Sequence, residues 1–254
     1  MRFFEPLLVA ISTYSIIPVP QFEWNERNTK YTLCFLPAVG VLCGAGLLAW
    51  YALCVYLKAT ALLFAAVGAC VPLLITGGIH MDGYMDTVDA LSSHQTRERK
   101  LEILKDPNCG AFAVIYCGIY LLLDVALLSE VYRMGIVPVL CLIFVLSRIL
   151  SALCAIRLPS ARKNGMLRAF TQNVQKNRST AVLVVLLLVT CGVMVVLVVR
   201  LSWFVLAAAA IWMAIYRRMV LQQFGGVTGD TAGFFLQMCE LLCLFGAWIG
   251  GLVL

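Results

Sequence analysis

The sequence predicts an all-α membrane protein: one domain over residues 1–254, folded as a polytopic bundle of about seven transmembrane helices with an additional N-terminal helix. Hydrophobic residues make up 62% of the chain and charged residues only 13%, whereas soluble domains carry roughly 25% charged residues. A soluble domain of this length has no core that could bury several uncharged runs of about 20 residues. The eleven cysteines are scattered without a Cys-x-x-Cys pair, so neither a disulfide framework nor a zinc site is expected.

Seven apolar runs are each long enough to cross a bilayer as a helix. An eighth apolar segment, residues 3–18, is interrupted by Glu5 and Pro6 and is closed by two further prolines. We expect this segment to lie in the membrane interface or to re-enter the membrane rather than to span it. The seven predicted spans are residues 33–57, 59–79, 110–128, 136–156, 180–199, 202–219 and 231–254.

The connections between these spans alternate in positive charge, and this asymmetry predicts the orientation of the chain. The alternate connections hold only Lys58, Arg133 and Arg200. The positive-inside rule therefore places the richer connections in the cytoplasm, where their charge attracts anionic lipid and equally attracts a phosphorylated substrate. The richer connections, with fourteen Lys and Arg between them, are residues 20–32, 81–109, 157–178 and 217–230.

The densest polar cluster is the stretch HMDGYMDTVD, from His80 to Asp89. In a helix, Asp82, Asp86 and Asp89 stand at positions i, i+4 and i+7 and share one face. Three clustered carboxylates repel one another unless a cation neutralises them, and such oxygen ligands suit Mg²⁺, or alternatively Mn²⁺. The competing interpretation is a helix start whose acids simply face water at the membrane surface.

Residues 97–106 have the pattern of an amphipathic surface helix, with Arg99 and Lys105 away from its apolar side. The Asp106-Pro107-Asn108 sequence is expected to end that helix. Both cations are candidate contacts for phosphate oxygens.

A glycine-rich turn, GGVTGDTAG over residues 225–233, leads into the last apolar run. Either Thr228 or Asp230 could cap the following helix, and backbone N–H groups at a helix start can bind an anion. Gly226 and Gly229 belong to this turn, which is not a Walker loop because no Gly-Lys-Ser/Thr follows.

Arg148 and Glu240 lie well inside apolar runs, where an unpaired charge is costly. Glu240 is therefore expected to be paired or functional. Arg148 could extend its side chain to the interface, pair with an acid such as Asp82 or Asp230, or contact a substrate phosphate.

Taken together, these blocks closely resemble the cobalamin synthase family. The similarity runs from the N-terminus to Glu240, with the blocks in the order that the family has. Ala90 departs from a usual glycine and Gln237 from a common acid, but the metal-type acids are intact. The matching blocks are IPVP at 17–20, TGGIHMDGYMDTVD at 76–89, RKLEILKD at 99–106, Ser147-Arg148, and GGVTGDT at 225–231.

The resemblance implies an enzyme of the bacterial inner (plasma) membrane that acts in the late nucleotide-loop assembly of adenosylcobalamin (vitamin B12). A hydroxyl of α-ribazole, or of α-ribazole 5′-phosphate, would attack the cobinamide phosphate of adenosylcobinamide-GDP, and GMP would leave. The family requires a divalent metal, usually Mg²⁺. No nucleic-acid partner is expected, and the assembly, monomer or homo-oligomer, stays open.

The resemblance and the chemistry of phosphate transfer together suggest a role for each polar cluster. Two other functions remain alternatives: a CDP-alcohol-type phosphotransferase of lipid synthesis, whose Asp-Gly-x-x-Ala-Arg motif this chain lacks, and a cation-coupled transporter, for which no internal repeat is seen. The predicted catalytic residues are His80, Asp82 and Asp86; the predicted metal ligands are Asp82, Asp86, Asp89 and Asp106; and the predicted substrate-binding residues are Arg99, Lys105, Arg148, Gly226, Thr228, Gly229, Asp230 and Glu240.

Overall fold

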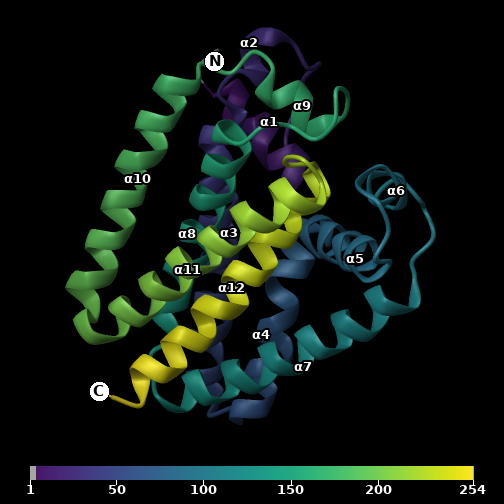
Figure 1. Ribbon diagram of the computed structural model, residues 1–254. Coiled ribbons are helices and arrows are strands. Elements are labelled where there is room, and N and C mark those ends of the chain that lie inside the picture. Colours follow the sequence, from purple (N-terminus) through teal and green to yellow (C-terminus); the bar gives the residue numbers. More distant parts are fainter. Residues whose placement is uncertain (1–3, 254) are drawn as a thin grey trace.

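A computed structural model describes residues 4–253 and, for Arg27, the backbone alone. Phe3 and Leu254, the outer limits of two predicted segments, lie outside the described residues. The described chain is all-α, as predicted: it forms helices and contains no strand beyond an isolated bridge between Ser160 and Val227 (Figure 1). The helices are α1 Glu5–Tyr14, α2 Glu26–Thr29, α3 Thr32–Leu57, α4 Ala61–Thr76, α5 Ile79–Ser92, α6 Arg97–Ile103, α7 Ala111–Arg133, α8 Val137–Arg157, α9 Met166–Thr171, α10 Lys176–Leu197, α11 Val199–Gln223 and α12 Gly229–Gly251.

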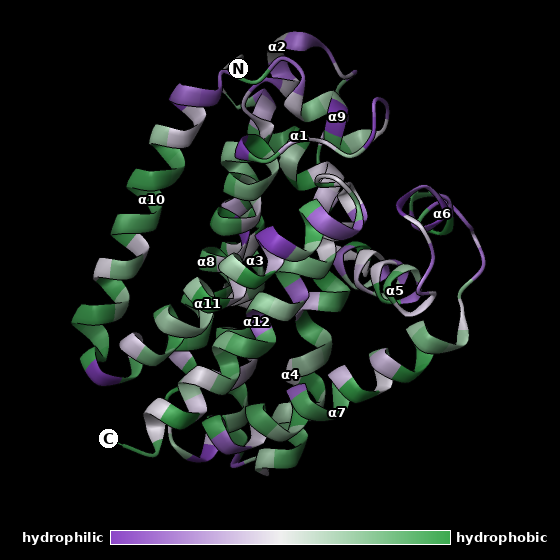
Figure 2. Ribbon diagram, in the orientation of Figure 1, coloured by the Kyte–Doolittle hydropathy of each residue, from purple (hydrophilic) through white to green (hydrophobic). Residues whose placement is uncertain are grey.

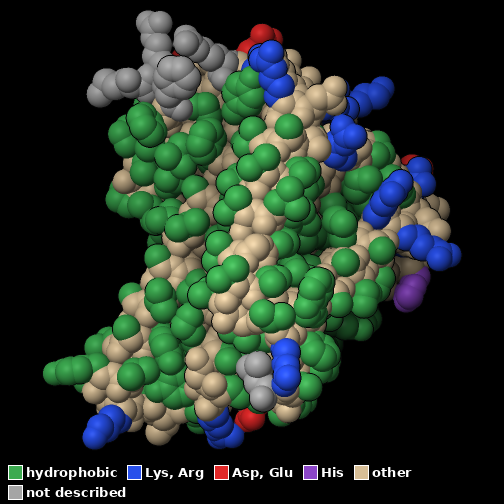
Figure 3. Space-filling view, turned by 90° about the vertical axis from the view of Figure 1, so that its left-hand side faces the viewer, with side chains coloured by type: hydrophobic (Ala, Val, Ile, Leu, Met, Phe, Trp, Pro, Cys, Tyr) green, Lys and Arg blue, Asp and Glu red, His purple; other side chains and the backbone are tan. Residues whose placement is uncertain are grey.

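Six of the described helices are individually long and apolar enough to cross a membrane, namely α3, α7, α8, α10, α11 and α12. In the most apolar part of α8, 72% of the residues are buried, against 17% in α7 and α10. The apolar surfaces of α7 and α10 therefore face outward, as lipid-facing helices do. Apolar residues run along most of the long helices in Figure 2, and hydrophobic side chains cover the middle of the face in Figure 3, with Lys and Arg toward its ends.

The predicted span 59–79 is interrupted, which corrects that prediction. Helix α4 ends at Thr76 after 16 residues, and α5 leaves it at an angle of 96°. Gly77 and Gly78 make this bend with φ of 62° and 76°, a left-handed conformation that is costly for residues with a Cβ atom. Only together do α4 and α5 count as a seventh span. The bend turns α5, which carries the acidic motif, away from the axis of α4 and against α12.

Other boundaries differ less from the prediction. The N-terminal segment forms the short helix α1, which packs against α3. Helix α11 begins at Val199, directly after α10, so that Arg200 lies inside a helix rather than in a connection. The predicted surface helix is α6, and it ends before Asp106 as expected.

Close approach between helix backbones brings the core elements together. A Cβ atom on Gly40 of α3 would lie 2.5 Å from the Phe144 carbonyl oxygen of α8. A Cβ atom on Gly83 of α5 would lie 2.8 Å from the Asp230 carbonyl oxygen at the start of α12, and one on Gly233 of α12 would lie 2.9 Å from the His80 carbonyl oxygen. Small residues at such contacts are typical of membrane helix packing. They hold α5 directly on the start of α12.

Candidate active site

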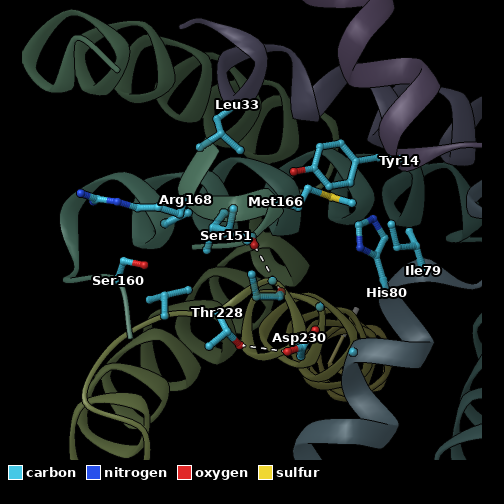
Figure 4. A pocket seen from close by; sticks show the side chains of 18 of the residues that line it. Tyr14, Leu33, Ile79, His80, Ser151, Ser160, Met166, Arg168, Thr228 and Asp230 are labelled. Carbon is cyan, nitrogen blue, oxygen red and sulfur yellow. Dashed lines mark hydrogen bonds between the residues drawn. The ribbon is translucent and has the colours of Figure 1, made fainter. Parts of the chain in front are cut away.

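A cavity of about 400 Å³ lies at the end of the bundle where α3 begins, α8 ends and α12 begins (Figure 4). Helix α5 forms one side, and the segment between α8 and α9 with the start of α9 forms another. Backbone hydrogen bonds join that segment to the turn before α12, because Val227 N–H donates to Pro159 O over 2.8 Å and Ala161 N–H donates to Val227 O over 3.0 Å. Polar residues that line the cavity are Tyr14, His80, Asp82, Ser151, Ser160, Arg162, Asn164, Arg168, Thr228 and Asp230.

Two predicted acids, Asp82 of α5 and Asp230 of α12, both line this cavity. The contact between α5 and α12 at Gly83 brings them to the same end of the two helices. Asp230 forms an ion pair with Arg162 at 3.3 Å and accepts a hydrogen bond from Thr228 Oγ1 at 3.4 Å. The cavity thus combines a carboxylate that has a cationic partner with one, Asp82, that is exposed.

The glycine-rich turn is organised by Thr228, as one of the two predicted caps. Its Oγ1 accepts a hydrogen bond from Thr231 N–H at 3.1 Å, and Thr231 Oγ1 accepts one from Thr228 N–H at 2.8 Å. Thr228 and Gly229 line the cavity, but Gly226 does not. Gly226 instead packs closely against the backbone of Pro159, where a side chain would collide. The structure therefore gives Gly226 a role in joining two loops rather than in contacting a ligand.

His80 is buried on the cavity wall, and its Nε2 has no hydrogen-bond partner among the described residues. Its ring stacks on that of Tyr14, with the centroids 6.0 Å apart and 20° between the ring planes. A buried ring nitrogen without a partner is unusual, and the catalytic role of His80 stays a prediction.

The three acids of α5 differ in their hydrogen-bond partners. The helix places Asp86 one turn from Asp82, within electrostatic reach of Asp82, Asp89 and Asp230. Both oxygens of Asp89, however, are used at the start of α7, where they accept hydrogen bonds from the N–H groups of Gly110 at 2.6 Å and Ala113 at 2.8 Å. In the described residues, no group of three or more His, Cys, Asp or Glu side chains is arranged to hold a metal ion. The expected three-acid face thus becomes a smaller set, with Asp89 serving as a helix cap.

We predict that Asp89→Ala acts on stability more than on chemistry. Loss of a helix-capping carboxylate typically costs about 0.5–2 kcal/mol, because two N–H groups at the start of α7 lose their acceptor. Thermal unfolding of the detergent-purified variant should show this loss, while its turnover per folded molecule falls far less than that of an Asp82 variant. A turnover loss equal to that of Asp82→Asn, with unchanged stability, would make Asp89 a ligand after all.

Three residues predicted from the surface helix and its end lie outside the cavity. Arg99 forms an exposed ion pair with Glu102 at 2.7 Å, and Lys105 is exposed. Asp106 accepts hydrogen bonds from the backbone and side-chain N–H groups of Asn108, and these lower the pKa of its carboxyl. The Asp106 carboxylate is therefore occupied in a local turn, not directed at the other acids.

Arg148 and Glu240 are paired with each other inside the bundle. Both are buried, and Glu240 also accepts a hydrogen bond from Ser147 Oγ at 2.8 Å. Neither residue lines the cavity described above. The structure therefore corrects the expected partners of Arg148, which were Asp82, Asp230 or a substrate phosphate, and gives this pair a structural position between α8 and α12.

Several cavity residues were not singled out from the sequence. In the sequence, Arg162 and Arg168 only added to the positive charge of a connection, and Tyr14 was only one residue of an apolar segment. The charge of residues 157–178 was the available signal, but a cation that orients the chain and one that binds a ligand look alike in a sequence. Ser151 carried no signal.

Comparison with known proteins shows the family of this chain. The family model described as cobalamin-5-phosphate synthase matches residues 6–248, nearly the whole chain. The chain belongs to the cobalamin-5-phosphate synthase family. The match includes the α5 acids, the turn before α12 and the Arg148–Glu240 pair, so the family extends over every element of the cavity.

Curated relatives of this family cover the chain almost completely. A protein of Lachnoclostridium phytofermentans is 39% identical over 242 residues, which are 95% of this chain and 92% of the relative. Proteins of Stutzerimonas stutzeri and Desulfitobacterium hafniense are 35% and 34% identical, each over 95% of this chain and 96% of the relative. All three are named adenosylcobinamide-GDP ribazoletransferase. No solved structure matches the chain.

Proposed function

We propose that this protein is an adenosylcobinamide-GDP ribazoletransferase that joins the cobinamide phosphate to ribazole with release of GMP. The observation that carries the proposal is a cavity at one end of a membrane bundle, lined by acids and arginines, in a chain of the cobalamin-5-phosphate synthase family. The names of curated relatives support the same reaction. They also favour it over a lipid phosphotransferase or a transporter.

The reaction forms one bond and breaks one. The oxygen of a ribazole hydroxyl bonds to the phosphorus that is attached to cobinamide, while the bond from that phosphorus to the oxygen of the guanylyl phosphate breaks. The hydroxyl proton leaves with a base, and GMP carries away the electron pair. Such a transfer needs charge neutralisation on the diphosphate and alignment of the attacking and leaving oxygens.

The acids of the cavity fit a magnesium ion that is completed by substrate. Mg²⁺ commonly takes only one or two carboxylates from the protein and shares the remaining positions between waters and substrate phosphates. Asp82 and Asp230 line the cavity, so these two are the residues that would hold it, and Asp86 adds negative charge nearby. When bound, the metal supplies neutralisation of the diphosphate charge; Mn²⁺ has the same ligand preference.

The remaining polar side chains divide the other tasks. Arg168 is exposed at the cavity and Arg162 reaches it from the same segment, so both can hold phosphate oxygens. His80, with its unpartnered Nε2, is the candidate to hold the ribazole hydroxyl in place. Thr228 and Gly229 offer the start of α12 to an anionic group.

The cavity is proposed to open to the cytoplasm from the bacterial inner membrane. The positive connections support this orientation, because the cavity-lining segment 160–168 belongs to one of them. The relatives named above are bacterial proteins.

The purified protein, given adenosylcobinamide-GDP and α-ribazole, is expected to release GMP and to stop when a chelator removes Mg²⁺. Membrane vesicles test the orientation, because substrates added outside should react with inside-out vesicles and not with right-side-out ones. GMP release that persists in excess chelator would reject the metal, and a protein without any GMP release would reject the proposed function itself.

A further inference from the structure

The cavity has two ends of different chemistry (Figure 4). Arg168 and Ser160 lie on one side, with Thr228 and Asp230 at the bottom. The opposite side holds Tyr14, His80, Ile79 and Met166, with Leu33 above the centre. One end therefore suits phosphate and a cation, whereas the other is aromatic and aliphatic. We call the apolar and aromatic part of the lining, formed by Tyr14, Leu33, Leu36, Ile79 and Met166, the apolar wall.

The Tyr14 ring is held firmly in this wall. It stacks on His80 and also contacts Phe170, with ring centroids 6.2 Å apart, and Phe170 in turn lies 4.9 Å from Trp24. Burial raises the pKa of the Tyr14 phenol, so the hydroxyl stays protonated and can donate a hydrogen bond. In Figure 4 this hydroxyl points from the ring toward the centre of the cavity. A fixed ring of this kind is a surface on which a planar base can stack.

We propose that the apolar wall, with Tyr14 at its centre, binds the benzimidazole base of the ribazole substrate and so selects the attacking nucleoside. This inference rests on the proposed function. It adds that the base of ribazole, rather than that of adenosylcobinamide-GDP, occupies the apolar part of the cavity. His80 lies between the apolar wall and Asp230 at the bottom of the cavity. A nucleoside whose base rests on Tyr14 would therefore direct its ribose hydroxyls past His80 toward the acids.

The size of the cavity supports this assignment. Cavities that hold drug-sized ligands span about 300–1,000 Å³, and this one, at about 400 Å³, is at the small end of that range. It accommodates a nucleoside, whereas a corrin macrocycle with its amide side chains is too large. The corrinoid must then remain outside, with only its diphosphate reaching the cationic end.

The chemistry of the wall separates the ribazole base from guanine, the other base in the reaction. Guanine carries a carbonyl, a ring N–H and an amino group on one edge, and each of these costs free energy when buried without a partner. Leu33, Leu36 and Ile79 offer no such partners. A methylated benzimidazole has one free ring nitrogen and otherwise apolar edges, so the Tyr14 hydroxyl alone could satisfy it.

The decisive experiment measures the KM of each substrate separately in the full-length, detergent-purified protein with Mg²⁺. Tyr14→Leu is expected to raise the KM for α-ribazole roughly 10- to 100-fold, because stacking of a base on an aromatic ring is lost, with the KM for adenosylcobinamide-GDP nearly unchanged. Tyr14→Phe keeps the ring and should raise the ribazole KM only about threefold, the effect of one lost hydrogen bond. Tyr56→Leu, at a position that is 83% exposed on α3, is the matched control and should change neither KM.

A second variant tests the apolar wall independently, in case Tyr14→Leu does not fold. Met166 is 45% exposed, so Met166→Glu should fold normally and place a carboxylate against the wall. It is expected to raise the ribazole KM at least about tenfold, since an apolar base would lie against a charge.

A higher KM for adenosylcobinamide-GDP alone in these variants would assign the wall to guanine and overturn the proposal. Equal increases for both substrates would reduce Tyr14 to a packing residue, which also overturns it. Wild-type protein that releases no GMP would instead reject the proposed function, so the two failures are distinguishable.

Discussion

Arg148→Ala is expected to lower the free energy of unfolding by about 3–5 kcal/mol, because removal of one partner leaves a buried charge without compensation. The charge left behind is that of Glu240, which is buried in α12 and would keep only Ser147 as a hydrogen-bond donor. The Arg148 side chain is also closely packed, since Gly40 of α3 lies against it. Thermal unfolding of the detergent-purified protein should show a fall in Tm on the order of 10 °C.

Two comparisons make this expectation specific. Arg133→Ala removes a cation whose partner, Glu130, lies at 2.8 Å but is exposed, so it should cost less than about 1 kcal/mol. The double variant Arg148→Met with Glu240→Gln removes both charges and should recover much of the lost stability. If Arg148→Ala unfolds like the wild type and only raises a substrate KM, Arg148 is the phosphate contact that the sequence suggested.

Local rules account for the parts of the site that sequence analysis predicted. The spacing of Asp82 and Asp86 needs only a helix, and α5 is one. The Thr228 cap follows from a polar residue placed just before an apolar run. The family resemblance, now confirmed over residues 6–248, came from such short blocks.

Partners chosen by helix packing could not be predicted in this way. Asp89 accepts hydrogen bonds at the start of α7, and Asp230 pairs with Arg162. Both contacts depend on how α5, α7 and α12 pack together. The bend at Gly77 was missed for a related reason: hydropathy reports the composition of a run and not its backbone dihedral angles, so an apolar run was extended through a break.

Tyr14 could not be predicted as a cavity residue for the same reason: its contacts are set by helix packing and not by local sequence. A tyrosine at the end of an apolar segment is ordinary in a membrane protein, where such residues gather at interfaces. Its place in the cavity depends on α1 packing against α3 and on the bend that turns α5 toward it. Only the folded chain brings Tyr14, His80 and Met166 to one wall.

Asp82→Asn is expected to reduce turnover about 100- to 1,000-fold while leaving the fold intact. A bound metal ion supplies several kcal/mol of charge stabilisation in the transition state, and each 1.36 kcal/mol corresponds to tenfold in rate. Asparagine keeps the shape of the side chain but removes the charge that would hold the metal. In the part of the chain that the structure describes, the exposed Asp82 carboxylate accepts no hydrogen bond and forms no ion pair. Its loss should therefore leave Tm unchanged.

Measurement of turnover and Tm together, across a Mg²⁺ titration, tests this reasoning. Asp106→Asn serves as the comparison, because Asp106 is exposed in a local turn with Asn108 and should keep turnover within about twofold of the wild type. If Asp82→Asn reached near wild-type turnover at saturating Mg²⁺, Asp82 would not be a metal ligand. We expect a loss of turnover that no Mg²⁺ concentration restores, at unchanged Tm, because Asp82 is exposed in the cavity that Asp230 and Arg162 also line.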